Sequence, residues 1–536
     1  MTTLQAAPVA PANQAWKLNW LTPARCRMIL ALLLAIDVAG HISYLNNHCP
    51  ADLSGDEAQY WDWSRNLDWS YYSKGPLVAY IIRGSCWMFG DSMQGVRYPA
   101  IAFGVGTSIV TYLLVRRLFG SERLALGTVL LTHVVPLFVG GSVLMTIDPP
   151  MFFCWALATY FAAGAIFEGR RWNWILAGLF VGVGFLAKYA LMAWFVGLLL
   201  YLILYGREQL KAAWPWIAFI VACVPTTPVV AWNVQHGGAS IWHVAHQTGA
   251  TGGKLSHGNF AELIGSQIMV VGPVIAIWMV CGIARAVGKS GVDDPHRRKL
   301  QFLVCIGLPF FVFTAIISLF AKAQVNWPAP AYFTLIILAA YFLSTRLASI
   351  ETWRRWRWWF WGTVVLGMVT IPLAHDSSRL FPIARLFHVN PSNVDVLMRL
   401  RGWKSLGHHV TQQLDVLGPN AFILCDDYMQ TAEMAFYVRG QPKTYYAGSY
   451  YADAKRFTQY DMWPDRRLDQ PALLGRDAVY VGKGGGLPKD IASAFDRVEQ
   501  LPELPVIVEG VTVRTFKTWR CYGFKGMIRA GRKMDY

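Results

Sequence analysis

The chain has 536 residues, of which 54% are hydrophobic, 14% are aromatic and only 15% are charged. Soluble domains carry about a quarter charged residues, so this composition excludes an ordinary soluble protein and indicates a membrane protein. The formal net charge is +16, but the basic residues lie in short clusters between apolar segments, as membrane topology requires. Nucleic acid is therefore not an expected partner.

Apolar segments recur through the first 375 residues. A helix needs about 20 apolar residues to cross the hydrocarbon core. We predict an all-α polytopic membrane domain over residues 28–375. Its expected spans, about eleven, are 28–45, 98–115, 124–145, 149–167, 172–187, 189–205, 214–232, 262–284, 301–321, 329–345 and 357–374. Residues 172–205 count as two spans because a single helix would be about 50 Å long. We expect them to turn near Lys188, interpreted as a snorkelling interfacial lysine.

Basic clusters set the expected orientation. Lys17, Arg25 and Arg27 precede the first span, which places the N-terminal segment 1–27 in the cytoplasm. The later clusters fall on the same side when eleven spans are counted. The opposite, periplasmic side then receives the following segments: 46–97, 146–150, 233–261, 321–328 and the tail from 376. We expect a multi-pass protein of the inner (plasma) membrane.

The tail, residues 376–536, has the composition of a soluble domain. Short apolar runs at 421–425, 477–481 and 505–513 predict strands, and residues 430–438 (QTAEMAFYV) predict a helix. We predict a small α/β domain on the periplasmic side. Two of the nine cysteines, Cys425 and Cys521, lie here and could pair if the compartment is oxidising.

The first loop is unusually rich in acidic and aromatic residues. Ser54 and Glu57 fit a capping box, which would explain Glu57 structurally. On the helix that would follow, Asp56, Tyr60 and Trp63 share one face. An aspartate backed by aromatic residues at a membrane surface can act as a general base toward an incoming hydroxyl. We favour that role for Asp56 and include Tyr60 among the substrate-binding candidates. For the aromatic residues as a group, interfacial packing is the better explanation.

Two basic residues of the same loop are candidates for binding a phosphate. Lys74 lies in a Lys-Gly-Pro turn, which would hold its charge in a fixed position. Arg97, in Val-Arg-Tyr-Pro, begins the second span on the side where positive residues are not expected. The alternative for Lys74 is an interfacial lysine that faces lipid headgroups.

Asp148, in Thr-Ile-Asp-Pro-Pro, lies between two apolar spans. An acid at this depth is costly and suggests a function. Capping of the helix that begins at Pro149 explains it equally well. Lys322 and Asn326 end on the same side, where they either line a donor site or anchor the chain at the interface.

The segment 233–261 is rich in histidine. Its basic residues are His236, His243, His246, Lys254 and His257. His243 and His246 could share a helical face, and we include His243 among the substrate-binding candidates. Two histidines without a fixed acid do not define a metal site. No metal ligand is therefore predicted, and a divalent metal stays open as a cofactor.

Soluble nucleotide-binding motifs are missing. The sequence contains no GxxxxGK[ST], and GKGGG at 482–486 is not followed by a helix signal. A donor for this protein must therefore be usable on a membrane face that lacks cytoplasmic nucleotides. A sugar on a polyprenyl phosphate meets that requirement, and the apolar bundle offers a place for its chain.

Five motifs in order resemble the GT-C glycosyltransferases, and most closely family 39, the dolichyl-phosphate-mannose–protein mannosyltransferase type with its bacterial relatives. They are Ser-Gly-Asp-Glu57, the Lys-Gly-Pro turn, Arg97-Tyr-Pro, Thr-x-Asp-Pro and Asn326-Trp-Pro. The resemblance covers about residues 20–345. The tail segments RLRGW, DDYMQTAEMAFYVRGQP and QYDMWP are also similar to bacterial members, which include the aminoarabinose lipid A transferases.

The resemblance implies roles for five residues. Asp56 would be the catalytic carboxylate, Glu57 its partner and Asp148 a second acid of the cavity. Lys74 and Arg97 would hold the lipid phosphate. The lipid A transferases carry an acidic residue before the lysine of the turn, where this chain has serine. The extra domain of the eukaryotic mannosyltransferases is absent.

These observations predict an inverting glycosyltransferase. It would move a sugar from a polyprenyl-phosphate donor to a hydroxyl or phosphate of a lipid, glycan or protein acceptor. The alternative is a transporter or flippase of lipid-linked sugars, which would predict inverted repeats and helices broken at the midplane. A non-catalytic assembly protein would leave Asp56, Glu57 and Lys74 unexplained.

Overall fold

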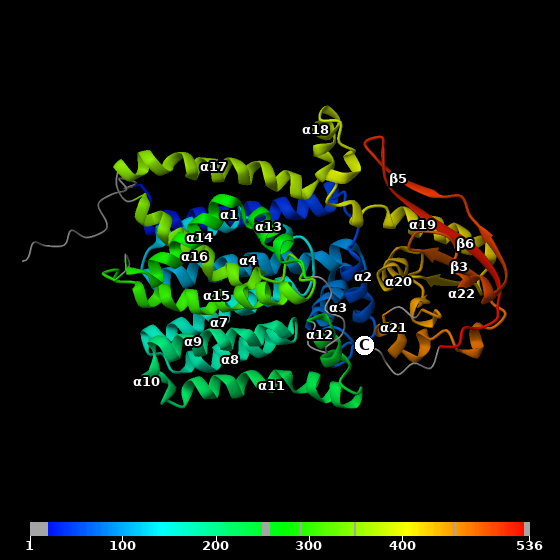
Figure 1. Ribbon diagram of the computed structural model, residues 1–536, viewed down its shortest axis with the longest axis horizontal. Helices are drawn as coiled ribbons and strands as arrows, with labels where there is room; N and C mark the ends of the chain where they lie inside the picture. Colours follow the sequence, from blue (N-terminus) through cyan, green and yellow to red (C-terminus); the bar gives the residue numbers. More distant parts are fainter. Residues whose placement is uncertain (1–19, 249–257, 290–291, 348–349, 454–455, 530–536) are drawn as a thin grey trace, which may run out of the picture.

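The computed structural model describes residues 20–248, 258–289, 292–347, 350–453 and 456–529. A bundle of roughly parallel helices, α1 to α17, forms one end of the molecule (the helical part). A sheet flanked by helices, α19 to β6, forms the other end (the sheet unit; Figure 1). Most of the N-terminal segment 1–27, together with Lys254 and His257, lies outside the described residues.

Each apolar segment that the sequence analysis picked out is helical. The helices are α1 (Pro23–Ser43), α4 (Met93–Phe119), α5 (Glu122–Thr132), α6 (Pro136–Gly141), α7 (Asp148–Glu168), α8 (Trp172–Phe185), α9 (Trp194–Tyr205), α11 (Trp214–Gln235), α13 (Phe260–Val271), α14 (Pro273–Val287), α15 (Arg297–Phe320), α16 (Ala329–Arg346) and α17 (Ile350–His375). Among the described residues, six helices are individually long and apolar enough to cross a membrane, and one bent pair brings the number to seven. The prediction of a multi-pass helical protein is confirmed.

Several of the expected spans are broken or short. The third divides into α5 and α6, with Pro136 at the start of α6, because proline lacks the N–H that a continuous helix needs. The eighth is bent by 101° between α13 and α14, where Gly272 has a φ of 93° and Pro273 follows. Residues 172–205 form the expected hairpin, with a 3-10 turn over Tyr189–Ala193. The break between α5 and α6 and the short lengths of α8 and α9 account for three of the expected segments that are not full-length spans; the eleventh, in α17, is long but is not among the described helices apolar enough to qualify.

Three further helices lie at the end of the helical part that faces the sheet unit. They are α2 (Gly55–Ser64), α3 (Leu77–Phe89) and α12 (Ala239–Gln247) (Figure 1). The α3 helix exposes Tyr80, Trp87, Met88 and Phe89. An exposed face of large apolar and aromatic side chains is typical of a helix that lies in the membrane interface.

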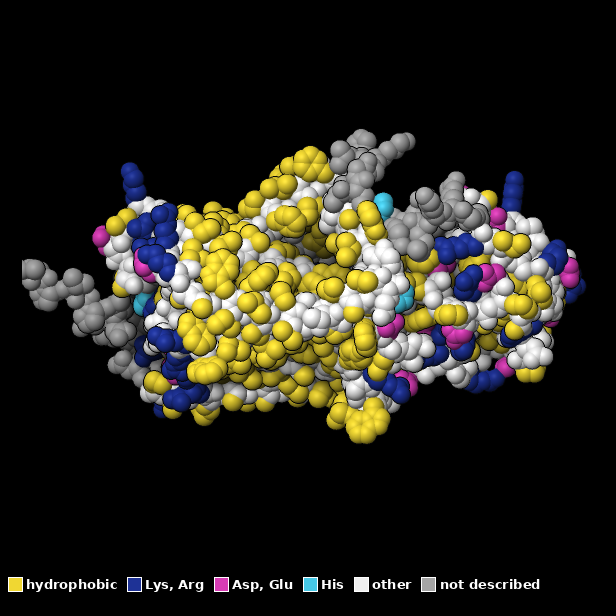
Figure 2. All heavy atoms as spheres, turned by 90° about the horizontal axis from the view of Figure 1, so that it is seen from below, with side chains coloured by type: hydrophobic (Ala, Val, Ile, Leu, Met, Phe, Trp, Pro, Cys, Tyr) yellow, Lys and Arg dark blue, Asp and Glu magenta, His cyan; other side chains and the backbone are white. Residues whose placement is uncertain are grey.

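The surface has the pattern of a membrane protein. Figure 2 shows hydrophobic side chains over most of the helical part, with Lys and Arg gathered at the end away from the sheet unit. This separation agrees with the basic clusters that were assigned to a single membrane face.

The sheet unit combines parallel and antiparallel strands. Its strands are β1 (Phe422–Cys425), β2 (Thr444–Tyr446), β3 (Ala478–Gly482), β4 (Phe495–Gln500), β5 (Leu504–Val508) and β6 (Val511–Phe524). The order is β2-β1-β3-β6-β4, and β5 pairs with β6. Strand β1 runs parallel to β2 and β3, whereas β6 is antiparallel to β3, β4 and β5. Helices α19 (Trp403–Leu417) and α20 (Tyr428–Tyr437) belong to the same unit, so the expected α/β tail is confirmed.

The suggested disulfide between Cys425 and Cys521 is wrong. Both thiols are buried and free. Cys425 is in register with Val481 of β3, whereas Cys521 is in register with Ala478 at the other end of that strand. Cys425 on β1 and Cys521 on β6 are thus two strand spacings apart and are offset by three residues along the strands. This separation exceeds the roughly 7 Å between Cα atoms that a disulfide can bridge.

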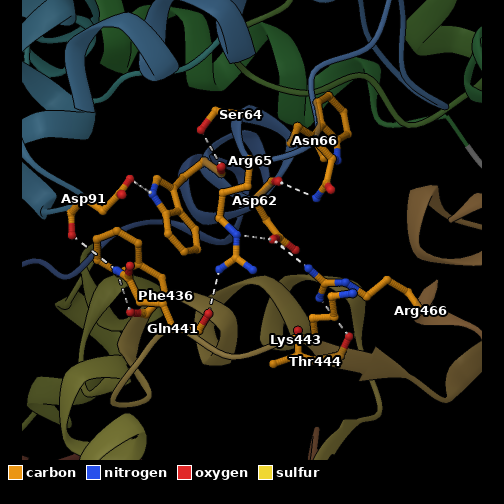
Figure 3. A network of polar contacts seen from close by, with 12 residues as sticks. Asp62, Ser64, Arg65, Asn66, Asp91, Phe436, Gln441, Lys443, Thr444 and Arg466 are labelled. Atoms are coloured by element: carbon orange, nitrogen blue, oxygen red, sulfur yellow. Dashed lines mark hydrogen bonds and ion pairs between the residues drawn. The ribbon is translucent and has the colours of Figure 1, made fainter. Parts of the chain in front are cut away.

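The sheet unit docks on α2. A Cβ atom at Gly55 would lie 2.5 Å from Cβ of Met429, so glycine permits α20 to approach closely. Arg466 pairs with buried Asp62 of α2 at 3.2 Å, and Arg65 approaches the same carboxylate at 3.5 Å (Figure 3). The first loop is thus held between the two parts of the molecule.

Candidate active site

The capping box predicted at the start of α2 is present. The Ser54 hydroxyl accepts a hydrogen bond from the Glu57 amide at 3.2 Å, and the Glu57 carboxylate accepts one from the Ser54 amide at 2.9 Å. The cap sets the rotation of the helix. Consecutive helical residues are about 100° apart around the axis, so Asp56 and Glu57 project in different directions.

Glu57 points into the protein and is paired with Arg97. Arg97 donates to the two carboxylate oxygens at 2.9 and 3.0 Å, and both side chains are fully buried. Glu57 also accepts from the Met145 amide, and Arg97 donates to the carbonyls of Ala51 and Asp52. The expectation that these two residues contact substrate therefore needs correction. Their hydrogen-bonding groups are occupied within the protein, where they join the first loop to α4 and to the segment before α7.

Asp56 projects in a different direction, toward Lys74, Asp148 and Arg456, whose charges act on its pKa. We call the space that these four side chains share, at the junction of the two parts, the recess. The Asp56 side chain is exposed, although protein surrounds it closely enough that burial is the largest cause of its raised pKa. The positive charges of Lys74 and Arg456 oppose that rise. Among the described residues, no hydrogen bond or ion pair engages the Asp56 carboxylate. It is therefore open to a ligand in a partly desolvated site.

The Lys-Gly-Pro turn places Lys74 at the same recess. Gly75 packs so closely on the end of α8 that a Cβ atom would lie 2.2 Å from the Leu186 carbonyl oxygen. The Leu77 amide donates to that same carbonyl at 3.1 Å. Burial, followed by the charge of Lys188, lowers the pKa of Lys74 to about 8, while Asp56 acts in the opposite direction. Within the described part of the chain, the Lys74 ammonium has no ion-pair partner.

Asp148 is held by two partners. The Lys188 ammonium donates to one carboxylate oxygen at 2.8 Å and the Asn326 side-chain amide donates to the other at 2.7 Å. Asp148 is the first residue of α7, yet its side chain makes no capping hydrogen bond. The capping explanation of Asp148 and the snorkelling interpretation of Lys188 are both wrong, because the two charges meet in the interior.

His243 also lies at the recess, but as a neighbour of Arg456. Arg456 donates to Nε2 of His243 at 3.1 Å, and the His243 ring packs on Tyr72 with centroids 4.9 Å apart. Burial and the charge of Arg456 lower the pKa of His243 to about 3, so the imidazole is neutral at physiological pH. The Arg456 guanidinium lies over the ring of Tyr428 at 5.3 Å.

Tyr60 and Lys322 complete the predicted set. Tyr60 is buried beside Trp63, and burial together with the charge of Asp56 raises its pKa well above the usual value. It is thus a neutral wall residue of the recess. Lys322 is exposed, and no contact joins it to Asp56, Lys74 or Asp148 in the described residues.

Sequence reasoning missed Arg456, Tyr428 and the partnership of Lys188 with Asp148. Arg456 and Tyr428 come from the sheet unit, 400 and 372 residues after Asp56 in the sequence, so no local spacing connects them. In the described part of the chain, no three His, Cys, Asp or Glu side chains form a group that could hold a metal ion.

A cavity of about 390 Å³ lies in the helical part near this recess. Its walls come from α1, α4, α5, α6, α7, α16 and α17, and are mainly apolar with a few polar side chains. Pro149, the residue after Asp148, contributes to the wall. The cavity therefore reaches the start of α7, next to Asp148 in the sequence.

Comparisons with known proteins agree with the geometry. Residues 73–232 match the family model described as dolichyl-phosphate-mannose-protein mannosyltransferase. The lipid A galacturonosyltransferase RgtD of Rhizobium johnstonii is 28% identical over 414 residues, which cover 75% of this chain and 81% of that protein. The undecaprenyl phosphate-alpha-4-amino-4-deoxy-L-arabinose arabinosyl transferase of Pseudomonas aeruginosa is 30% identical over 186 residues, about a third of each chain.

The fold has a solved counterpart. The crystal structure of ArnT from Cupriavidus metallidurans bound to undecaprenyl phosphate superimposes with a TM-score of 0.62 at 16% identity, covering 94% of this chain and 98% of that one. The likeness extends over both the helical part and the sheet unit. The chain is therefore a multi-pass membrane glycosyltransferase with the GT-C fold, related to the dolichyl-phosphate-mannose-protein mannosyltransferases and to bacterial lipid A sugar transferases.

Proposed function

We propose that this enzyme is an inverting transferase that moves a sugar from a polyprenyl-phosphate donor to a hydroxyl or phosphate acceptor on a lipid, glycan or protein. The reaction would take place at the periplasmic face of the inner membrane. The concentration of Lys and Arg at the end of the bundle away from the recess supports that orientation (Figure 2). The proposal treats residues 28–375 and 376–536 as two domains that share one site.

In this mechanism, Asp56 removes the proton of the acceptor hydroxyl as the acceptor oxygen attacks the anomeric carbon of the sugar. The bond between that carbon and the phosphate oxygen breaks, and the electron pair leaves with the lipid phosphate. Lys74 neutralises the negative charge that develops on the departing phosphate, an electrostatic contribution that is usually the largest in such sites. With a phosphate acceptor, which is already deprotonated, Asp56 would instead help to orient the nucleophile.

One observation carries the proposal: among the described residues, the Asp56 carboxylate and the Lys74 ammonium have no ion-pair partner, whereas the other two carboxylates of the site, those of Glu57 and Asp148, are paired. Glu57 is bound by Arg97, and Asp148 by Lys188 and Asn326. Charges left unpaired in a partly desolvated recess are costly unless a ligand uses them, which makes such groups strong candidates for function. The paired residues would position the first loop and the Lys74 turn.

The apolar cavity beside Pro149 supports a lipid substrate. Its volume of about 390 Å³ can hold part of a polyprenyl or acyl chain but not a whole one. The relatives support the same substrate class, since their names specify lipid A or undecaprenyl phosphate. We propose a lipid acceptor ahead of a protein or glycan acceptor on that ground.

The test is transfer of label from radiolabelled polyprenyl-phosphate sugars to a membrane extract, with wild type compared with Asp56→Asn. The matched control is Asp415→Asn, which removes an exposed carboxylate on α19 of the sheet unit. We expect product with wild type and Asp415→Asn, and a loss of at least about 100-fold with Asp56→Asn, the scale of general-base catalysis. Full activity of Asp56→Asn would refute the base role. Label that crosses the bilayer without forming product would favour the transporter.

A further inference from the structure

Arg456 differs from three other arginines near the junction between the helical part and the sheet unit. Arg97, Arg401 and Arg466 each pair with a buried or partly buried carboxylate. The partners of Arg456 among the described residues are neutral: the His243 imidazole and the ring of Tyr428. Its positive charge is therefore not compensated by an ion pair in the part of the chain that the structure describes.

The backbone of Arg456 is fixed from both sides. The Tyr446 hydroxyl of β2 donates to the Arg456 carbonyl at 3.0 Å. The next residue, Phe457, packs on Tyr72 of the first loop with ring centroids 5.3 Å apart. The sheet unit thus holds this arginine against the loop that carries Lys74, and an exposed side chain is kept in a defined place.

Arg456 is close enough to the recess to act on its groups. Its charge opposes the raised pKa of Asp56 and contributes to the lowered pKa of both Lys74 and His243. Because His243 is neutral, its Nε2 accepts one N–H of the guanidinium without cancelling the charge. A guanidinium has five N–H donors in a planar fork, a geometry that suits the two oxygens of a phosphate or carboxylate.

We propose that Arg456, presented by the sheet unit, forms an oxyanion-binding subsite of the active site, separate from Lys74. The inference rests on the proposed function and extends it, because the site would be incomplete without the sheet unit. The oxyanion has two possible sources. One is the phosphate of the polyprenyl donor, and the other is an acidic group elsewhere on the substrates, namely a carboxylate on the transferred sugar or a phosphate on the acceptor.

The first experiment measures equilibrium binding of polyprenyl phosphate, with uncharged polyprenol as the reference lipid, to the full-length protein in detergent. The variants are Arg456→Gln and Arg456→Lys. The matched control is Arg439→Gln, which removes an exposed arginine of the same unit that pairs with Asp415. Binding needs no turnover, so it reports on the subsite independently of the chemical step.

If the donor phosphate is the ligand, Arg456→Gln weakens polyprenyl phosphate binding by about tenfold or more, as expected for a lost charge-assisted hydrogen bond. Arg456→Lys restores part of the affinity, while polyprenol binding and Arg439→Gln remain unchanged. If the second source is correct, polyprenyl phosphate binding is unaffected. The KM then rises about tenfold for a donor with a carboxylated sugar, or for a phosphorylated acceptor, but not for the uncharged counterpart.

The outcomes that overturn the inference are distinct from those that overturn the proposed function. Unchanged polyprenyl phosphate affinity together with unchanged KM for every charged substrate would refute the subsite. Equal losses for polyprenol and polyprenyl phosphate would also refute it, because they would indicate a packing role. Wild-type protein that binds polyprenyl phosphate no better than polyprenol would refute the proposed function itself.

Discussion

The unusual pKa of Lys74 predicts how the rate depends on pH. Burial and neighbouring positive charge lower it to about 8 in the free enzyme. If the protonated ammonium binds the donor phosphate, kcat/KM is constant well below pH 8 and falls as the pH rises through that value. Asp56 has the opposite effect, because its carboxylate must be deprotonated to act as a base. The rate therefore also falls at low pH, as the pH drops through the pKa of Asp56, which is raised above 3.8.

The size of the alkaline effect follows from the pKa. A group with a pKa of about 8 is about 90% protonated at pH 7 and about 9% protonated at pH 9, so kcat/KM should fall about tenfold between these values. Two neighbouring groups, His243 and Tyr60, titrate far from this range. The pKa of His243 is about 3, and that of Tyr60 is well above the ordinary tyrosine value.

The assay is the initial rate of sugar transfer against pH, at donor concentrations below and above KM. Bound phosphate favours the charged lysine, so the alkaline limb of kcat should lie at higher pH than that of kcat/KM. Lys74→Arg should abolish the alkaline limb because a guanidinium does not lose its proton in this range. Samples held at pH 9 and returned to pH 7 before assay control for inactivation. An alkaline limb near pH 8 that persists in active Lys74→Arg would refute the assignment.

Two further predictions concern the framework around these charges. Arg97→Met should lower the free energy of unfolding by about 3–5 kcal/mol, because it leaves the Glu57 carboxylate buried and unpaired. The double variant that adds Glu57→Gln should lose less. Thermal unfolding in detergent measures both, and a loss below about 1 kcal/mol in the single variant would contradict the stabilising role of the buried pair. Gly75→Ala would put a Cβ atom 2.2 Å from the Leu186 carbonyl, whereas Gly84→Ala on α3 meets nothing within 4 Å. The first should lower kcat/KM at least about tenfold by displacing the Lys74 turn, and the second should leave the rate of transfer unchanged.

Much of the fold could be predicted from periodicity and length. Apolar segments located the membrane helices, and the length of 172–205 predicted its hairpin. Short apolar runs located β1 and β3, whereas the third run, 505–513, covers most of β5, a turn and the start of β6. The breaks within the predicted spans were harder to predict, because a proline within an apolar segment does not by itself show whether the helix continues. The α13–α14 bend has a local signal, Gly272-Pro273, but its angle depends on the helices that surround it.

The candidate site could be predicted in part. The motifs drew attention to Asp56, Lys74 and Asp148, and the structure brings these residues to one recess. The pairing of charges could not be read from the sequence, because it depends on contacts between distant segments. Lys188 meets Asp148 across 40 residues, and Arg456 reaches the recess from a loop of the sheet unit. The sequence positions of Lys188 and Arg456 do not distinguish them from ordinary surface lysines and arginines.

The Asp-Glu pair shows why neighbouring acids need not share a function. On a helix, adjacent side chains diverge by about 100°, so a carboxylate that faces a recess requires its neighbour to face elsewhere. Here the capping box fixes that rotation: Glu57 bonds back to Ser54, binds Arg97 in the interior, and thereby directs Asp56 outward. Glu57 and Arg97 thus contribute to the site through position, whereas Asp56 and Lys74 are available to substrate. In this chain the acidic pair is therefore better understood as one anchoring residue, Glu57, and one residue that is open to a ligand, Asp56.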